Sequence, residues 1–389
     1  MRRLFTLMVV LLLLTVGSAA LAQEAPPVFC GSLAQADCDL LNQARVAGEN
    51  LDSGTVSFNF NLNISGVPDL PDNANINVTG TGAFFGAGSF KQFSAMSADA
   101  AAADLGAMFP SLLDALENFS GDLSLTITIP PELAEDGPST LPLNLRLVNG
   151  VGYIDFDALQ PITEDPSLTG WGGLDFVSLF RDLLEQQPDL LDELSDMSGA
   201  SVTMGMDPDI VARFSDPAFA EQFLSIQRVA DENGYAVFET NFDFNGLLAD
   251  PEFQQYLRDQ MQQQAAEQGE EMSEEDINEA LQITSTMFEN STFVIREAID
   301  PATGFTRSTS GSMVFDMSSL AAMAEEQGES MDATPIINID FNVSMDNLNS
   351  TAAINAPENA SLFPYQMLLG MAGSMQEMPM DEVTPEVGD

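Results

Sequence analysis

The chain has 389 residues, of which 60 are Asp or Glu and only 11 are Lys or Arg, so its formal net charge at pH 7 is −49. Phosphate backbones and anionic membrane surfaces repel such a chain, which excludes nucleic acid as a partner. Hydrophobic residues make up 45% of the sequence, which excludes disorder throughout, and the length allows one large domain or two small ones.

The first 22 residues have the three parts of a secretory signal peptide. Arg2 and Arg3 form a basic start, residues 4–16 are apolar apart from two threonines, and Ala20-Leu21-Ala22 is a small-x-small cleavage site. The apolar run is shorter than the about 20 residues that span a bilayer. We therefore predict cleavage after Ala22 and a secreted or periplasmic mature protein without a transmembrane segment. An uncleaved N-terminal anchor is the alternative.

Residues 23–54 are expected to form an N-terminal helical arm. They contain Cys30 and Cys38, the two cysteines of the chain. In an exported protein this close pair predicts a disulfide, because extracytoplasmic compartments are oxidising. Its short loop indicates a stabilisation of roughly 2–3 kcal/mol. The pair does not indicate a metal site, since the sequence has no His and no second Cys pair.

Residues 55–362 are dominated by alternating apolar and polar residues, the pattern of strands with one buried face. The alternation is clearest at residues 56–65, where Phe58, Phe60 and Leu62 are separated by Asn. Strands with one polar face are typical of antiparallel sheets. Further strands are predicted at residues 123–129, 141–147, 151–156, 223–229, 235–244, 293–298, 312–317 and 337–345.

Turn signals connect several of these strands. Asn149-Gly150 and Asn233-Gly234 each predict a tight hairpin, because both residues tolerate the positive φ angles of such turns. Residues 300–304 predict a third hairpin. A sheet built from these strands has one apolar face that must be covered by a second sheet or by helices.

Helical patterns are available to cover that face. Residues 99–118 are Ala-rich and amphipathic, and Phe176, Phe180 and Leu183 lie on one stripe of a second helix. Asp250-Pro251 predicts the start of a helix over 252–264, and Ser273 opens a capping box for a helix to Phe288. Acidic, polar stretches at 265–271 and 324–333 predict loops, and residues 363–389 predict a disordered acidic tail.

The order of these elements resembles the LolA/LppX-like lipoprotein and lipid carriers of bacterial envelopes. The turn Asp300-Pro301-Ala302-Thr303-Gly304-Phe305-Thr306-Arg307 is similar to a D-x-x-T-G-x-x-R hairpin of exported carriers, and residues 354–360 are similar to their closing segment. The resemblance covers residues 31–362. It implies an α+β fold, a large curved antiparallel β-sheet that forms a half-barrel-like meander with helices over one face, and a site for acyl chains. The chain departs from the family in its greater length and in lacking a lipobox.

Catalytic signals are weak. The absence of His excludes a Ser-His-Asp triad and a His-ligated metal. Lys91, the only Lys, allows a Ser-Lys dyad with Ser89 or Ser94, and the many carboxylates allow a glycosidase pair, but nothing in the sequence singles out either. We therefore predict a non-enzymatic protein without a cofactor or metal.

One segment has the spacing of a calcium-binding loop. Asn241, Asp243, Asn245, Gly246 and Glu252 fall at the ligand and glycine positions of an EF-hand. Apolar alternation runs through the same segment, however, which favours a strand end followed by a turn and a helix N-cap at Asp250.

The leading functional prediction is a secreted carrier or binder of an apolar small molecule or lipid. The chain is rich in Phe and Met, with 26 and 20 residues, which suit an adaptable apolar cavity and equally suit an ordinary core. The alternative is an extracellular structural or interaction protein with a fully packed core and no ligand. The residues expected to line the cavity are Phe58, Phe60, Leu62, Leu125, Ile127, Leu143, Leu145, Phe180, Leu183, Phe242, Ile339 and Phe341.

Overall fold

The structure is a computed structural model, and it describes most of the chain between residues 28 and 364. The predicted signal peptide, the loop at 324–333 and the tail from 365 lie outside the described residues, as do residues 99–104 of a predicted helix. The described residues are 28–67, 70–71, 73–90, 105–134, 137–163, 169–186, 217–267, 272–319, 321–322 and 334–364.

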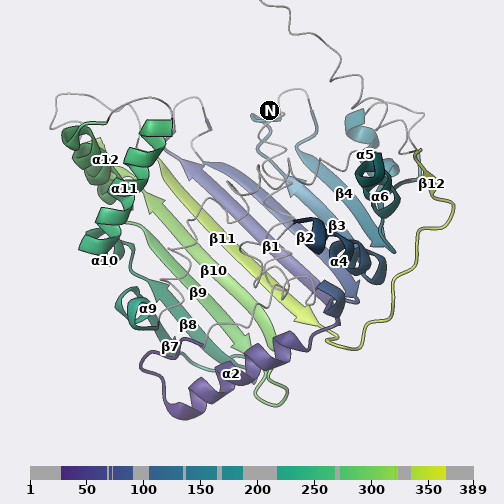
Figure 1. The fold of residues 1–389 in the computed structure, drawn as a ribbon, viewed down its shortest axis with the longest axis horizontal. Coiled ribbons are helices and arrows are strands. Elements are labelled where there is room, and N and C mark those ends of the chain that lie inside the picture. Colours follow the sequence, from purple (N-terminus) through teal and green to yellow (C-terminus); the bar gives the residue numbers. More distant parts are fainter. Residues whose placement is uncertain are drawn as a thin grey trace, which may run out of the picture.

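A single twelve-stranded open sheet forms the centre of the molecule (Figure 1). The strand order is β12-β6-β5-β4-β3-β2-β1-β11-β10-β9-β8-β7. The strands are β1 (Ser53–Ser65), β2 (Ala74–Phe85), β3 (Ser120–Thr128), β4 (Thr140–Val148), β5 (Val151–Asp155), β6 (Trp171–Asp175), β7 (Leu224–Arg228), β8 (Ala236–Phe242), β9 (Thr292–Ile299), β10 (Thr306–Asp316), β11 (Ile336–Asp346) and β12 (Ser361–Leu362).

The sheet consists of two antiparallel meanders joined at one seam. Strands β1 to β6 form the first meander and β7 to β11 the second, and each strand pairs with the next in sequence. The seam is the antiparallel pairing of β1 with β11, in which Phe60 lies opposite Phe341. β12 returns along the molecule and pairs with β6, the one parallel pair among the named strands. The predicted α+β fold with a large, curved, mostly antiparallel sheet is confirmed.

The hairpins confirm the turn signals. Asn149 and Gly150 have φ angles of 52° and 76°, and Asn233 and Gly234 have φ angles of 52° and 84°. Two consecutive positive φ angles match the right-handed twist of the flanking strands. In the β9–β10 turn, the Asp300 side chain accepts hydrogen bonds from the Ala302 backbone N–H and the Thr303 hydroxyl, at 2.9 Å each.

Strand register places the apolar side chains of all the main strands on the same face of the sheet. Directly paired residues share a face, and Phe58 pairs with Val343 on one side and with Gly80 on the other. Gly80 in turn pairs with Leu125, which pairs with Leu143. The side chains that alternate with these along each strand point to the opposite face, and they are mainly Ser, Thr and Asn. We call these two surfaces the apolar face and the polar face.

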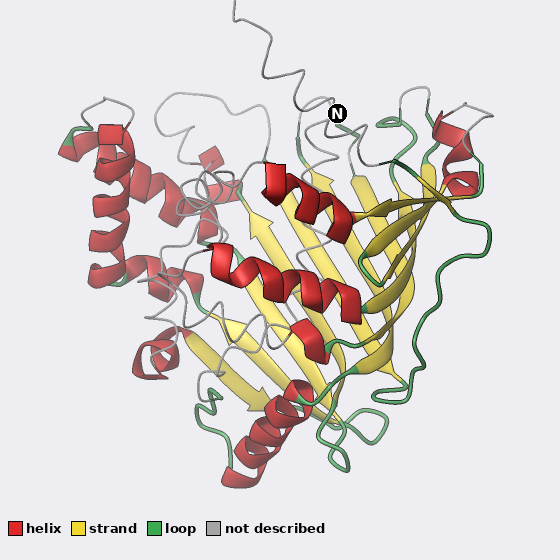
Figure 2. Ribbon diagram, turned by 45° about the vertical axis from the view of Figure 1, so that its right-hand side comes forward, coloured by secondary structure: helices red, strands yellow, loops and turns green. Residues whose placement is uncertain are grey.

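The helices lie on one side of the sheet (Figure 2). α2 contacts β9 at one end of the sheet, α10 and α12 pack near the other end of β8 to β10, and α5 and α6 contact β4 to β6. The helices are α2 (Gln35–Glu49), α4 (Leu105–Asn118), α5 (Phe156–Thr163), α6 (Phe176–Gln186), α9 (Pro217–Phe223), α10 (Phe244–Ala249), α11 (Pro251–Glu267) and α12 (Glu274–Phe288).

The predicted helix starts in the second half of the chain are confirmed. Asp250 accepts hydrogen bonds from the backbone N–H groups of Glu252 and Phe253 and so caps α11. Ser273 and Asp276 form a reciprocal capping box at α12. The loop predicted at 265–271 is wrong for its first part, because α11 continues to Glu267; residues 268–271 lie outside the described part.

Candidate functional site

The centre of the apolar face is formed by β1 and β11 at the seam. Phe60 lies opposite Phe341 and Leu62 lies opposite Ile339, so four of the predicted lining residues form two adjacent cross-strand pairs. All four side chains are half-buried. They are shielded from water only in part by the described residues around them.

Two phenylalanine rings lie across glycines of the neighbouring strands. A Cβ on Gly80 would stand 2.5 Å from the Phe58 ring, and a Cβ on Gly311 would collide with the ring of Phe341. Each ring therefore occupies the space that a side chain on the next strand would take. As a result, the rings lie flat along the sheet instead of standing up from it.

The predicted lining residues on β3 and β4 share the apolar face, but they differ in exposure. Leu125 and Ile127 are only 5% and 9% exposed, so they belong to the packed core. Leu143 and Leu145, which are paired with residues of β3, are half-buried.

The predicted lining residues near the helices also differ from one another in their surroundings. Phe242 packs against Phe244 of α10, with ring centroids 4.5 Å apart, and Phe244 contacts Phe288 of α12 and Phe293 of β9. Phe242 is thus part of an aromatic cluster that closes one end of the face. Phe180 is half-buried on α6, and the side chain of Leu183 lies outside the described part of the chain.

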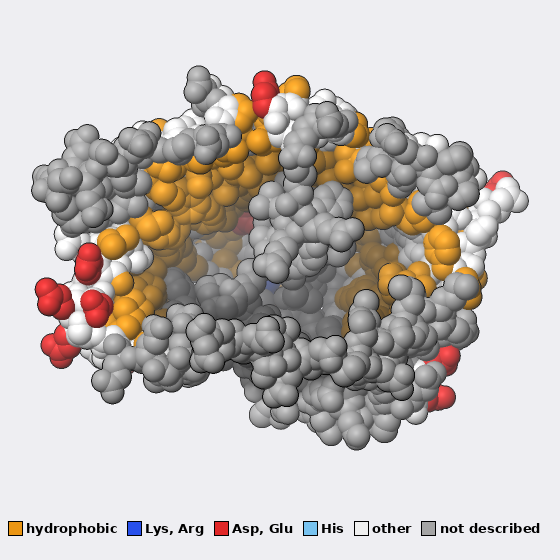
Figure 3. All heavy atoms as spheres, turned by 90° about the horizontal axis from the view of Figure 1, so that it is seen from above, with side chains coloured by type: hydrophobic (Ala, Val, Ile, Leu, Met, Phe, Trp, Pro, Cys, Tyr) orange, Lys and Arg blue, Asp and Glu red, His pale blue; other side chains and the backbone are white. Residues whose placement is uncertain are grey.

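A view of the molecule from above shows the space beside the apolar face. Hydrophobic side chains line the inner side of a hollow that follows the curve of the sheet (Figure 3). The acidic side chains visible in this view lie mainly at its outer edges. The predicted lining residues on β1, β4 and β11 are half-buried on one face of the sheet, whereas Phe242 lies in the aromatic cluster at the end of this face.

The disulfide-bearing arm closes the second end of the apolar face. Leu41 of α2 is buried against Ile226, Ala236, Phe238 and Ile299 of β7 to β9. Cys30 and Cys38 form a disulfide, with Cα atoms 5.3 Å apart, which confirms the predicted pair.

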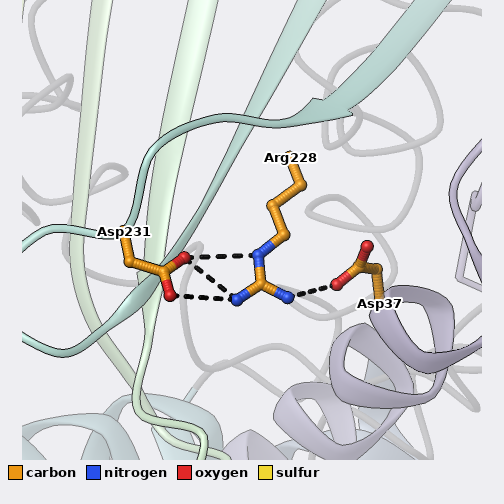
Figure 4. Close-up of polar contacts among 3 residues, drawn as sticks. All are labelled: Asp37, Arg228 and Asp231. Carbon is orange, nitrogen blue, oxygen red and sulfur yellow. Dashed lines mark hydrogen bonds and ion pairs between the residues drawn. The ribbon is translucent and has the colours of Figure 1, made fainter.

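An ion-pair cluster attaches this arm to the sheet. Arg228 at the end of β7 donates a hydrogen bond to Asp37 of α2 at 2.5 Å and also contacts Asp231 at 2.9 Å (Figure 4). The hydrogen bond to Asp37 is the main cause that raises the pKa of the Arg228 guanidinium, and the bond to Asp231 adds to it. Arg228 therefore stays charged and holds α2 against β7 at every physiological pH.

An ionisable side chain interrupts the apolar face on β9. Glu297 follows Phe293 and Ile295 in the apolar phase of β9 and lies opposite Phe238 and Thr309. Burial raises the pKa of its carboxyl group. Sequence reasoning missed this residue, although the apolar alternation of 293–299 is interrupted at this position alone and could have revealed it.

The polar face carries a separate groove of about 540 Å³. Ser57, Thr81, Ser124 and Asn144, which form one cross-strand row, line it together with Arg146 and Trp171. The Arg146 guanidinium lies 5.4 Å from the centre of the Trp171 ring and donates a hydrogen bond to the Asn355 carbonyl at 3.0 Å. The groove is polar, so it does not suit an alkyl chain.

Residues 241–252, which have the spacing of a calcium-binding loop, form the end of a strand and the starts of two helices instead. β8 ends at Phe242, and Asp243 caps the short helix α10 by accepting a hydrogen bond from the Gly246 N–H. The strand end and the N-cap at Asp250 are therefore confirmed, although Asn245-Gly246 lies in the first turn of α10 and not in a separate turn. Within the described ranges, no group of three or more His, Cys, Asp or Glu side chains could hold a metal ion.

No helix in the described part of the chain is long and apolar enough to cross a membrane. No protein-family model and no curated protein sequence matches the chain.

Proposed function

We propose that the protein is a secreted or periplasmic, non-enzymatic carrier of a lipid or a similar apolar ligand, which binds along the apolar face. The observation that supports this proposal best is the half-buried apolar wall at the β1–β11 seam, together with the hollow lined by hydrophobic side chains in Figure 3. Residues that only fill a core are buried far more completely, as Leu125 and Phe238 are, at 5% and 1% exposure.

The energetics favour a long alkyl chain. Each methylene group moved from water into an apolar site contributes about 0.8 kcal/mol, so a dozen give about 10 kcal/mol. The cost of immobilising the ligand takes away at least about 4 kcal/mol of this sum. The remainder still corresponds to useful affinity, and the rings of Phe58 and Phe341 lie over Gly80 and Gly311 of the neighbouring strands.

The proposed compartment rests on the N-terminal sequence and fits the disulfide. Arg2, Arg3 and the Ala20-Leu21-Ala22 site direct export with cleavage after Ala22, and the Cys30–Cys38 bond persists in an oxidising compartment. The resemblance to LolA/LppX-like carriers, which hold acyl chains in a curved half-barrel, supports the same function.

Ligand binding is tested most directly with the exported protein. Native mass spectrometry of the purified protein should show a lipid adduct, and fluorescent fatty acids or phospholipids should bind at micromolar concentration. Phe60→Trp should reduce uptake, because the larger ring narrows the hollow. Asn59→Trp is the matched control, since Asn59 is exposed on the polar face of the same strand; this variant should bind as the wild type does.

The alternative is an extracellular interaction protein whose core is fully packed. The polar groove beside Arg146 and Trp171 is the observation that favours it, because it offers a partner a recognition surface without a lipid. If the wild type shows no adduct and binds no lipid probe, the carrier proposal is wrong and this function replaces it.

A further inference from the structure

Glu297 lies in a cross-strand row that runs over the middle of the apolar face. On one side of Glu297 the row passes Phe238 of β8 and ends at Arg228 of β7, whose charge is paired with Asp37 and Asp231. The row continues from Glu297 to Thr309 on β10, Val343 on β11, Phe58 on β1 and Gly80 on β2. Neighbouring strands are roughly 4.8 Å apart, so the path from Glu297 to Phe58 measures roughly 14 Å. One acyl chain spans about half of a bilayer core of roughly 30 Å, which is about the same length.

The surroundings of Glu297 set it apart from the other acidic residues. Its neighbours on the same face are Phe238, Thr309, Ile295 and Ile299, none of which is charged. Ile299 belongs to the cluster under α2, and Phe293 of the same strand belongs to the aromatic cluster under α10 and α12. Phe238, opposite Glu297, belongs to the cluster under α2 as well, so Glu297 lies beside that cluster, in the row that continues through Thr309 to the seam.

The carboxyl group has no partner that the structure describes. Across the described ranges, neither a hydrogen-bond donor nor a cation pairs with it, and desolvation is the sole cause of its raised pKa. An unpaired carboxyl in apolar surroundings is costly, and a cation that pairs with it removes much of that cost. An anionic head group would add a like charge and increase the cost.

We propose that Glu297 binds the head group of the ligand, and that the ligand is a single-chain amphiphile with an amine head and an alkyl tail lying along the row towards Phe58. The inference rests on the proposed carrier function and specifies the ligand class for the same site. Thr309, next to Glu297, offers a hydroxyl that can accept a second hydrogen bond from the ammonium group. The tail then crosses Val343 and the flat ring of Phe58, in contact with apolar atoms only.

The test compares three probes that share a twelve-carbon tail: dodecylamine, dodecanol and dodecanoate. Binding is measured by calorimetry at pH 8, below the aggregation limit of each probe, at 0.05 M and 0.5 M NaCl. The wild type should bind dodecylamine at least tenfold more tightly than dodecanoate, with dodecanol between them. Part of this preference at low salt comes from the net charge of −49, and 0.5 M NaCl suppresses that part.

Two variants isolate the local contribution. Glu297→Gln should reduce the preference for dodecylamine over dodecanoate about tenfold at both salt concentrations and leave dodecanol binding within twofold. Glu232→Gln removes the same charge from an exposed position in the β7–β8 turn and should keep the wild-type preference. A melting temperature within a few degrees of the wild type shows that each variant is folded.

The possible outcomes separate this inference from the proposed function. If all three probes bind but Glu297→Gln keeps the wild-type ranking, or if the wild type shows no ranking at 0.5 M NaCl, the head-group assignment is wrong and the carrier function stands. If no probe binds the wild type at all, both are overturned.

Discussion

At the level of single residues, Glu297 also governs how stability depends on pH. Its pKa is raised in the folded state, so the stability it contributes is present below its unfolded pKa and is lost as pH rises through the folded value. Without ligand, Glu297→Gln should therefore be more stable than the wild type at pH 8, whereas the difference should vanish near pH 4. Urea titrations at both pH values measure this. An equal difference at the two pH values would show that the carboxyl is not desolvated.

The glycines under the phenylalanine rings give a second residue-level prediction. Gly311→Ala should lower the free energy of unfolding by about 1–3 kcal/mol, because the new methyl group forces the Phe341 ring out of its position. Gly48→Ala in α2 is the control, since a Cβ there meets nothing within 4 Å. That change should stabilise the protein by about 0.5–1 kcal/mol, because Ala favours the helix. A neutral Gly311→Ala would mean that the Phe341 ring is free to move away.

The same glycines explain which parts of the fold could not be predicted from the sequence. β2 was missed because Gly80 and Gly82 interrupt its apolar phase, although these positions are covered by the Phe58 ring and by neighbouring strands. β6 was missed for the same reason, since Gly172 and Gly173 stand where side chains would mark a strand. Regular alternation and Asn-Gly turns, by contrast, predicted β1, β3, β4 and both hairpins correctly.

At the level of elements, the arm that carries the disulfide is predicted to depend on it. Replacing Cys30 and Cys38 together by Ser should lower the free energy of unfolding by about 2–3 kcal/mol, because the short crosslink restricts the unfolded chain. Denaturant unfolding of the oxidised wild type and of the variant checks the value. Amide exchange should rise first in α2, which the disulfide and Arg228 hold in place. Equal stability of the two proteins would contradict this prediction.

For the candidate site, the sequence predicts which face of each strand is apolar, but it does not predict the order of the strands in the sheet. The alternation identified which residues share a face within a strand, so ten strand residues were placed on the apolar face correctly. It could not show which strands are neighbours, because the β1–β11 pairing joins segments that no turn connects. For this reason the alternation assigns Phe242 and Phe60 to the same cavity, whereas Phe242 packs against Phe244 of α10 in the aromatic cluster that Phe288 of α12 joins.

For the whole molecule, the charge predicts a response to salt. With 60 acidic residues against 11 basic ones, like charges repel one another over the surface, and 0.1 M salt screens this repulsion beyond about 10 Å. The melting temperature should therefore rise from low salt to 0.5 M NaCl, and millimolar divalent cations should act in the same direction. Scanning fluorimetry over a series of NaCl concentrations measures this change in melting temperature. A flat or falling trend would mean that local pairs such as Arg296–Glu239, at 2.7 Å, outweigh the repulsion.

The seam between β1 and β11 sets the order in which the molecule can assemble. Each meander needs only contacts between strands that are close in sequence, so each can form early and locally. The seam brings residue 60 next to residue 341 and therefore cannot close until almost the whole chain has been delivered. Until then, β1 and β11 are both open edges with strongly apolar faces, which are the features that lead to misassembly between chains. The slowest and most vulnerable step of biogenesis is thus the joining of two finished halves, at the same strands that form the middle of the ligand wall.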